Sequence, residues 1–301
     1  MNARLQQLMA LLRLGACLAV LLWSWQSGQS MAEGLGWLLL VGWGWALLML
    51  PRFLVPHLLA PQRWLPALQA WWTEVWVCER VFSWHQPFAS QSQADHLPAA
   101  CGKPGVLLLH GFSCNRGLWN PWMRLLRARG NPFIALTLEP AYGSIDAYAD
   151  SIEAALQALE RASPGRPPLI VGHSMGGLAA RAWLRRYGRV GRVQAVVTLG
   201  TPHDGTALAH LSHTINGRQM RRDSPWLTGL AADETPALYQ QFDCVYSRED
   251  QIVFPAETAV LPGSRVSLLP HLGHLGLAFA PQSYALVLQR LDEAEGLGAG
   301  G

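Results

Sequence analysis

The chain shows two kinds of hydrophobic pattern, and the change between them falls near residue 105. Before that position, apolar residues form long runs at 14–25 and 35–50. The first run extends back to Leu5 if Arg13 is tolerated, and the second ends at Pro51. After residue 105, short apolar runs alternate with longer amphipathic stretches. The later pattern is typical of strands alternating with helices, and it predicts a parallel sheet covered on both faces.

Each short apolar run predicts a strand, and each amphipathic stretch predicts a helix. The strands are expected at 106–109, 133–138, 169–171, 193–199, 244–247 and 266–269, and the helices at 118–129, 145–161, 174–187 and 282–293. Residues 65–84 predict an interfacial helix that runs into an irregular strand, and 90–103 predict a polar loop. We therefore expect three parts: a hydrophobic helical hairpin over 1–60, an interfacial segment and linker over 61–104, and an α/β domain over 105–295.

The two long apolar runs predict a transmembrane hairpin. A helix needs about 20 residues to cross the hydrocarbon core of a membrane. Tryptophans lie at the ends of both runs, as is typical of segments that end at a membrane interface. Arg4 and Arg13 precede the first run, Arg52 and Arg63 follow the second, and the linker 26–34 has no Lys or Arg. Under the positive-inside rule, both ends and the α/β domain lie in the cytoplasm. A secretory signal with a periplasmic or secreted domain, and a soluble or monotopic packing, are the alternatives.

Composition agrees with partial contact with lipid. Half of the 301 residues are hydrophobic and only 14% are charged, against about 25% in a typical soluble domain. The net charge of +3, carried by scattered arginines, argues against a nucleic-acid partner. The five cysteines show no metal-ligand spacing, so we interpret them as reduced thiols and expect no metal. A Cys101–Cys114 bridge is the alternative for an exported domain.

A nucleophile motif follows the third predicted strand. Gly172-His173-Ser174-Met175-Gly176 fits G-x-S-x-G, with a strand before it and a helix after it. This strand–turn–helix is the setting of a nucleophile elbow. Gly172 and Gly176 lack a Cβ, so strand and helix can approach closely, and the helix N-terminus favours negative charge at Ser174. An incidental serine in a glycine-rich turn is the alternative.

The segment resembles the α/β-hydrolase superfamily, and within it the bacterial triacylglycerol lipase-like serine hydrolases. The resemblance covers about residues 105–293. It rests on His110-Gly111-Phe112, Gly-Ser-Ile-Asp-Ala-Tyr at 143–148, the elbow, Leu-Gly-Thr-Pro-His-Asp-Gly-Thr at 199–206 and Ser-Arg-Glu-Asp-Gln-Ile-Val at 247–253. It implies an α/β-hydrolase fold. Only one clear strand precedes the two neighbours of the elbow, so we expect the sheet to lack the first strands of the full fold. The N-terminal hairpin lies outside the family pattern.

The resemblance also implies a catalytic acid. A serine hydroxyl needs a base to take its proton, and the base needs an acid to hold its tautomer. In this fold the chain order is Ser, then Asp or Glu, then His. Asp250 follows a strand and is the predicted acid. Glu249 is the nearest competitor, whereas Asp243 precedes the strand and lies at its wrong end.

The predicted base is His274, within Leu-Gly-His-Leu-Gly at 272–276, which resembles the base loop of the family. His271, three residues earlier, is the alternative. His173 lies inside the elbow, and we expect it to pack beside the site.

Two backbone N–H groups are expected to stabilise the oxyanion. One is that of Met175, directly after the nucleophile. The other is that of Phe112, in a loop that resembles the oxyanion loop of the family and that His110 is expected to brace. His203 is expected to fix its loop, with a place in the acyl pocket as the alternative.

These observations predict a serine carboxylic-ester hydrolase of the bacterial inner membrane, acting on lipid-like acyl esters through an acyl-enzyme on Ser174 without a cofactor. Residues 206–242 stand where lipase-like enzymes place a lid; an ordinary pair of connecting helices is the alternative. The calcium that related lipases often bind has no matching carboxylate pair here. A thioesterase, an acyltransferase and a non-catalytic membrane scaffold are the other functions considered. The sequence does not indicate an oligomeric state.

Overall fold

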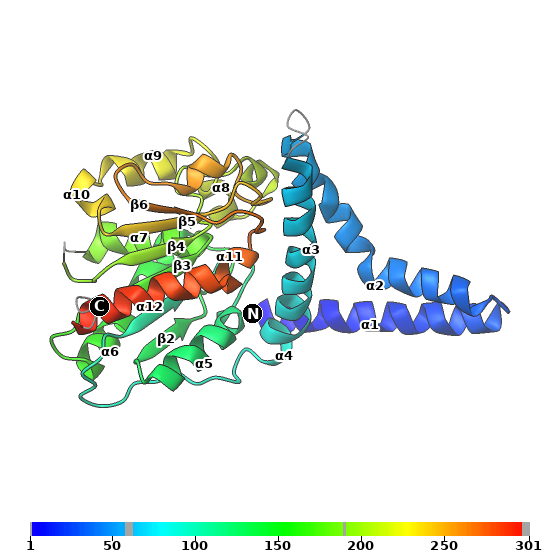
Figure 1. Ribbon diagram of the computed structural model, residues 1–301, viewed down its shortest axis with the longest axis horizontal. Helices are drawn as coiled ribbons and strands as arrows, with labels where there is room; N and C mark the ends of the chain where they lie inside the picture. The colour runs from blue at the N-terminus through cyan, green and yellow to red at the C-terminus, as the bar shows by residue number, and fades with distance from the viewer. Residues whose placement is uncertain (1, 58–62, 189–190, 297–301) are drawn as a thin grey trace.

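The computed structural model describes residues 2–57, 63–188 and 191–296, which form an α/β body and an N-terminal arm of helices (Figure 1). The body contains a six-stranded sheet in the order β2-β1-β3-β4-β5-β6, with every neighbouring pair parallel. The strands are β1 (Val106–Leu109), β2 (Phe133–Leu136), β3 (Leu169–His173), β4 (Val196–Leu199), β5 (Phe242–Tyr246) and β6 (Arg265–Leu268). Because all strands run the same way, the loops that follow them meet at one edge of the sheet.

Alternate residues of the strands face opposite layers of helices. In β1, Leu107 and Leu109 pack toward α6 and α7, whereas Val106 and Leu108 pack toward α5 and α12. The bounds of these helices are α5 Asn120–Arg129, α6 Ala149–Ala162, α7 Met175–Tyr187 and α12 Pro281–Glu295. Burial on both faces explains why the strands read as continuous apolar runs.

The predicted α/β fold is confirmed, and all six predicted strands are present with ends shifted by no more than a few residues. Within the described residues no strand precedes β1, in agreement with the shortened sheet that we expected. Short helices complete the body: η4 (Arg116–Trp119), η5 (Ile145–Tyr148), η6 (Ala207–Leu211), α8 (Ile215–Gln219), α9 (Pro225–Ala232), α10 (Pro236–Tyr239), η7 (Ala256–Ala259) and α11 (Gly276–Phe279).

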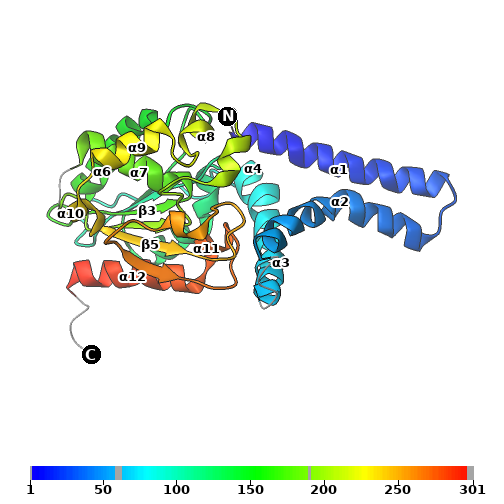
Figure 2. The same ribbon diagram turned by 90° about the horizontal axis from the view of Figure 1, so that it is seen from above.

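The first two helices pack side by side as a hairpin that projects from the body (Figure 2). They are α1 (Asn2–Gln26) and α2 (Met31–Leu54), followed by the short η1 (Val55–His57). Ser30 and Glu33 form a capping box that starts α2. Both helices are long and apolar enough to cross a membrane.

The predicted ends of the hairpin helices need correction. α1 begins near the N-terminus, so it follows the extension of the first run back toward Leu5 and includes Arg13, and α2 continues through Pro51, where the predicted run ends. A proline removes one intrahelical N–H donor, yet the next turn still forms, because Val55 N donates to Pro51 O. Arg13 therefore lies in the middle of α1 and does not precede the apolar helix.

The segment after the hairpin is helical throughout. α3 (Trp64–Arg80) continues into a π-helix (Val81–His85) and the short α4 (Gln86–Phe88), so the predicted irregular strand is wrong. The loop that follows pairs with the sheet only through a bridge between His96 and Phe133. Figure 1 shows α3 standing between the hairpin and the body, beside the edge where the strands end. The N-terminal helices thus reach the part of the fold that holds the site.

Candidate active site

Ser174 occupies a sharp bend between β3 and α7. Its φ of 55° and ψ of −125° lie in a sparsely populated region, and such a residue stores about 1–3 kcal/mol of strain. The flanking glycines explain how the bend fits: a Cβ on Gly172 would lie 2.6 Å from Gly177 N, and one on Gly176 would lie 2.2 Å from Leu109 O. Ser174 N donates to Leu199 O across the adjacent strand (2.9 Å), which holds the bend at the edge of the sheet.

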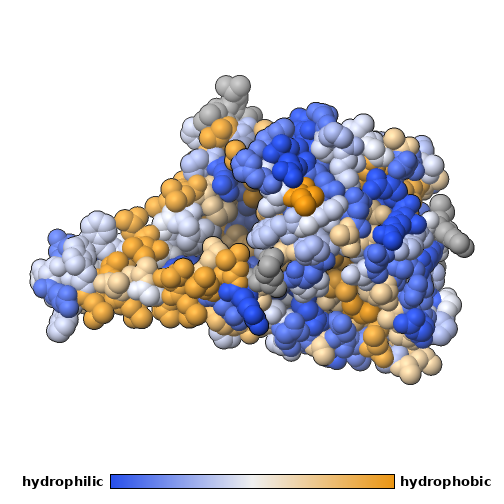
Figure 3. Space-filling model, turned by 180° about the vertical axis from the view of Figure 1, so that it is seen from behind, coloured by the Kyte–Doolittle hydropathy of each residue, from blue (hydrophilic) through white to orange (hydrophobic). Residues whose placement is uncertain are grey.

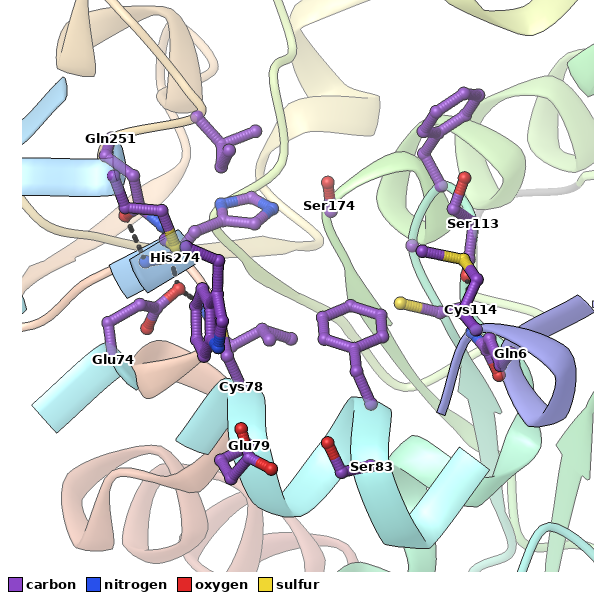
Figure 4. Close-up of a pocket in the computed structure, with 18 of the residues that line it drawn as sticks. Gln6, Glu74, Cys78, Glu79, Ser83, Ser113, Cys114, Ser174, Gln251 and His274 are labelled. Atoms are coloured by element: carbon purple, nitrogen blue, oxygen red, sulfur yellow. Dashed lines mark hydrogen bonds between the residues drawn. The ribbon is translucent and has the colours of Figure 1, made fainter. Parts of the chain in front are cut away.

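His274 and Asp250 are joined by a hydrogen bond beside this bend. His274 Nδ1 donates to Asp250 Oδ2 at 2.8 Å, and Asp250 Oδ1 accepts from Ile252 N at 2.8 Å and Val253 N at 2.9 Å. A carboxylate accepts but does not donate, so the proton lies on Nδ1 and Nε2 is left as a base. Figure 4 shows the imidazole of His274 turned toward Ser174. No hydrogen bond joins the two side chains among the described contacts.

Burial lowers the pKa of His274, but the charge and hydrogen bond of Asp250 outweigh burial, so that the pKa is raised above its usual value. A neighbouring carboxylate stabilises the imidazolium that forms when the base accepts a proton. The pair is therefore suited to take up a proton from a hydroxyl and to return it.

The alternatives from the sequence lie elsewhere. Glu249 Oε2 accepts from His271 N at 3.0 Å and from Ser247 Oγ at 3.2 Å, so it fixes the turn of its own loop. His271 is exposed and does not contact the acid. Asp243 lies within β5 and pairs with two arginines, Arg265 and Arg290. The structure brings Asp250 and His274 together, and none of these three joins them.

The loop after β1 is placed against Ser174. A Cβ on Gly111 would lie 2.8 Å from Ser174 Cβ, so only glycine allows this approach. His110 Nδ1 donates to Gly111 O at 2.8 Å, while its Nε2 accepts from Leu138 N at 2.9 Å. Burial lowers the pKa of His110 to about 4, so the ring is neutral and keeps this tautomer.

This bond fixes the direction of the next peptide N–H. The peptide unit is planar and trans, so a Gly111 O held toward His110 turns Phe112 N–H the opposite way. Within the described residues, Phe112 N donates no hydrogen bond. Met175 is the first residue of α7, and the first N–H groups of a helix have no partner inside it. Both amides are available to a developing anion.

The other two predicted histidines have different surroundings. His173 Nε2 donates to His274 O at 3.1 Å, and the two rings are 4.6 Å apart, so His173 packs against the loop of the base. Burial lowers the pKa of His173, which keeps it neutral. His203 Nε2 bonds to Thr198 Oγ1 at 3.1 Å, and its backbone O accepts from Arg181. His203 does not line the cavity described below.

Sequence reasoning missed Glu74, a carboxylate of α3 that is 1% exposed. Its Oε1 accepts from Gln251 Nε2 at 2.9 Å and Leu275 N at 2.8 Å, and its Oε2 accepts from Gly276 N at 2.9 Å. Gln251 Oε1 in turn accepts from His274 N. Burial raises the pKa of Glu74, while these donors act in the opposite direction. The one available signal was helical spacing, since Glu74 shares a face of α3 with the buried Ala67, Ala70 and Cys78.

A cavity of about 760 Å³ lies over Ser174 and His274. The N-terminal helices and the π-helix form about half of its wall, and loops of the α/β body form the rest (Figure 4). The wall residues from these helices include Leu5, Met9 and Arg13 of α1, Met49 of α2 and Cys78 of α3; Phe82 of the π-helix lies beside them. From the 206–242 insertion, only Leu208 lines this cavity, because α8 and α9 pack over α7 instead. The N-terminal helices cover the cavity, whereas 206–242 contribute Leu208 to its wall.

Among the residues that the structure describes, no group of three or more His, Cys, Asp or Glu side chains is placed to hold a metal ion. All five cysteines are free thiols, including Cys101 and Cys114, for which a bridge was the alternative.

Comparisons with known proteins agree with this architecture. Residues 106–292 match the group described as "Alpha/beta hydrolase family". The mature lipase BlEst2 of Bacillus licheniformis is similar in structure, with a TM-score of 0.55 and 16% identity over 64% of this chain and 94% of that one. Lipase B of Aspergillus fumigatus has a TM-score of 0.55 and 19% identity over 68% of this chain and 57% of its own length. At these identities the likeness concerns the fold. No curated protein matches the sequence.

Proposed function

The chain belongs to the alpha/beta hydrolase family, and from this premise we propose that it is a serine hydrolase that cleaves lipid-like acyl esters at a membrane. The observation that carries the proposal is the arrangement at the carboxyl edge of the sheet. There, a strained Ser174 lies beside His274, whose Nδ1 is bonded to Asp250 at 2.8 Å. The lipases of similar fold are consistent with this chemistry.

In the proposed reaction, Ser174 Oγ attacks the ester carbonyl carbon while His274 Nε2 takes the hydroxyl proton. The tetrahedral intermediate collapses, the alcohol leaves with the proton from His274, and the acyl group stays on Ser174. Water then gives a proton to His274 and its oxygen attacks the acyl carbon. The fatty acid departs as Ser174 regains its proton.

Phe112 N and Met175 N are the proposed donors to the carbonyl oxygen in both tetrahedral intermediates. Each donor of this kind lowers a barrier by about 3 kcal/mol. His110 acts as a positioning residue in this proposal, because its bond to Gly111 O sets the direction of Phe112 N–H. Donors that are held in place before substrate binds need no reorganisation during the reaction, which is how such a pair would lower the barrier.

We further propose that the hairpin anchors the enzyme in a membrane, and that α3 lies at its surface. Large apolar side chains of α1 and α2 face outward, including Leu12 at 63% and Leu48 at 81% exposure. Such a surface is unfavourable in water and favourable in hydrocarbon. A signal sequence cleaved after residue 22 would remove Leu5 and Met9, which line the cavity, and this supports a retained anchor.

The proposed side of the membrane follows from the hairpin geometry. Both ends of the hairpin return to the body, so the catalytic domain lies on the same side as those ends (Figure 1). Arg4, Arg52 and Arg63 mark those ends, which under the positive-inside rule face the cytoplasm. In this organisation residues 1–60 are the anchor, 61–104 the interfacial segment and linker, and 105–295 the catalytic domain.

Labelling with a fluorophosphonate probe tests the proposed nucleophile. The detergent-solubilised full chain should be labelled, and Ser174→Ala should not, because the probe reacts with an activated serine hydroxyl. Ser92→Ala, which changes an exposed serine in the loop before β1, is the matched control and should be labelled like the wild type. Absence of labelling in folded wild-type protein would refute a serine hydrolase.

Substitution of Glu74 by glutamine should shift the pH dependence of ester hydrolysis. The charge of Glu74 contributes to the raised pKa of His274, and the base must be neutral to act. Activity is therefore lost as pH falls through that pKa, and removing the charge should move the acid limb of kcat/KM to lower pH. Glutamine also offers one acceptor oxygen to three N–H donors, so we expect kcat to fall by about tenfold, since small misplacements of a base are costly.

The control for this shift is Glu160→Gln. It neutralises a carboxylate on α6 that forms an ion pair with Arg192. It should leave the acid limb in place. If Glu74→Gln and the wild type gave superimposable pH profiles, Glu74 would have no influence on the base.

A further inference from the structure

The cavity over Ser174 runs from a buried end to an exposed end. At the buried end, Ser174 is 6% and His274 is 7% exposed. At the other end, Leu5 is 45%, Met9 is 61% and Phe82 is 37% exposed. These three apolar side chains come from α1 and from the π-helix after α3. The cavity therefore reaches the surface between the hairpin and the segment that follows it.

That end of the cavity borders an apolar surface. The helices that line that end also carry outward apolar side chains. These include Leu8 and Leu12 of α1, Trp72 and Trp76 of α3 and Trp84 of the π-helix, each at least 49% exposed. Figure 3 shows the apolar surface of the hairpin continuing to its junction with the body. Tryptophans on a helix next to a long apolar hairpin are typical of the boundary between headgroups and hydrocarbon. The cavity thus faces the region where a bilayer lies in the proposed orientation.

α1 is attached to the catalytic loops by specific polar contacts, which an anchor alone does not need. Gln6 is 8% exposed, and its Nε2 donates to Gln86 Oε1 at 2.7 Å and to Ser113 O at 2.9 Å. Its Oε1 accepts from Asn115 Nδ2 at 3.2 Å. Ser113 directly follows Phe112 in the loop proposed to hold the oxyanion. These hydrogen bonds therefore fix the first turns of α1 relative to the loop that contains Phe112.

One ion pair lies in the wall of the cavity near its exposed end. Arg13 Nη1 donates to Glu79 Oε2 at 2.9 Å and to Ser83 Oγ at 3.3 Å, and both charged side chains are partly exposed. The apolar side chains of the exposed end line one route for an acyl chain. The ion pair provides polar groups for the alcohol part of a lipid whose ester lies at Ser174.

We propose that the substrate is an acyl ester resident in the bilayer, which reaches Ser174 sideways between α1 and the π-helix with its acyl chain against Leu5, Met9 and Phe82. The hairpin is then part of the acyl-binding site as well as an anchor. The inference rests on the proposed function and names the source of its substrate. It assigns specificity to residues that lie outside the segment matching the family.

Narrowing the exposed end tests this route. Met9→Trp should lower kcat/KM for p-nitrophenyl palmitate in mixed micelles by about tenfold or more, because the larger indole takes up space that the long acyl chain needs and displaces it from its site. Hydrolysis of p-nitrophenyl butyrate and fluorophosphonate labelling should fall much less, because a short acyl chain does not extend to the narrowed end. The ratio of kcat/KM for palmitate to that for butyrate should therefore drop. Leu5→Trp is a second variant with the same expected pattern.

The matched control is Leu12→Trp, which adds the same side chain to α1 at a position outside the cavity wall. It should hydrolyse both esters like the wild type. Equal changes for palmitate and butyrate in Met9→Trp and Leu5→Trp, or no change in either variant, would overturn the route while labelling of Ser174 left the proposed function intact. Loss of labelling in the wild type would instead overturn the proposed function and this inference with it.

Discussion

Replacing His274 by alanine is expected to lower kcat for ester hydrolysis by about 10⁵- to 10⁶-fold, the cost seen when a serine hydrolase loses its base. Ser174 Oγ then has no group to take its proton, and Asp250 lacks the imidazole that links it to the nucleophile. The residual rate comes from binding and from the amides that receive the oxyanion. The measurement is kcat with p-nitrophenyl butyrate, together with loss of fluorophosphonate labelling.

His271→Ala is the matched control, since it removes an imidazole from the same loop. His271 is exposed and engages Glu249 through its backbone N only, so its side chain can be removed without loss of that bond. We expect kcat to stay within about two-fold of the wild type, as for most exposed positions. If His271→Ala were the inactive variant and His274→Ala were active, the assignment of the base would be wrong.

The sequence predicted the sheet and the neighbours of Ser174 because these depend on local patterns. A buried parallel strand is a short apolar run, and the bend after β3 needs glycine on both sides, as Gly172 and Gly176 show. Asp250 and His274 were placed by chain order and by resemblance to a family. The structure adds that Glu249 and His271, their competitors, bond to each other through the backbone of residue 271.

The sequence did not predict that the N-terminal helices form part of the cavity wall, because the contacts that hold them there join residues far apart in the chain. Glu74 bonds to Leu275 N and Gly276 N about 200 positions later, and no local pattern encodes that pairing. Gln6 reaches Ser113 across 107 positions. The apolar residues of α1 were interpreted as an anchor because apolar character alone does not distinguish a lipid-facing side chain from one that lines a cavity.

The same contacts change the interpretation of the N-terminal region. An anchor that only tethers a domain is replaceable by another anchor, whereas α1 and α3 hold polar groups directly against the loops of the site. Gln6 contacts the loop of Phe112, and Glu74 contacts the loop of His274. Removing the hairpin should therefore alter the reacting centre itself. The catalytic domain and the membrane segment form one functional unit in this proposal.

Replacing Asp250 by asparagine is expected to lower kcat by about 10⁴-fold with the fold retained, as when the acid of such a triad loses its charge. The amide oxygen of the introduced side chain can still accept from Ile252 N and Val253 N, so the turn is kept. The amide nitrogen then faces His274 Nδ1, where two donors cannot bond. His274 must move its proton to Nε2, and the nitrogen next to Ser174 is no longer a base.

Glu249→Gln is the matched control, since it neutralises the adjacent carboxylate, which accepts from Ser247 and His271 and does not contact His274. We expect its kcat to fall by less than about tenfold, because only one loop contact weakens. The comparison uses kcat at a pH above the acid limb, with thermal unfolding to verify the fold of each variant. If a folded Asp250→Asn enzyme kept nearly wild-type kcat, Asp250 would not set the tautomer of His274. The amide nitrogen of the introduced asparagine would then have left His274 Nε2 free to act as the base.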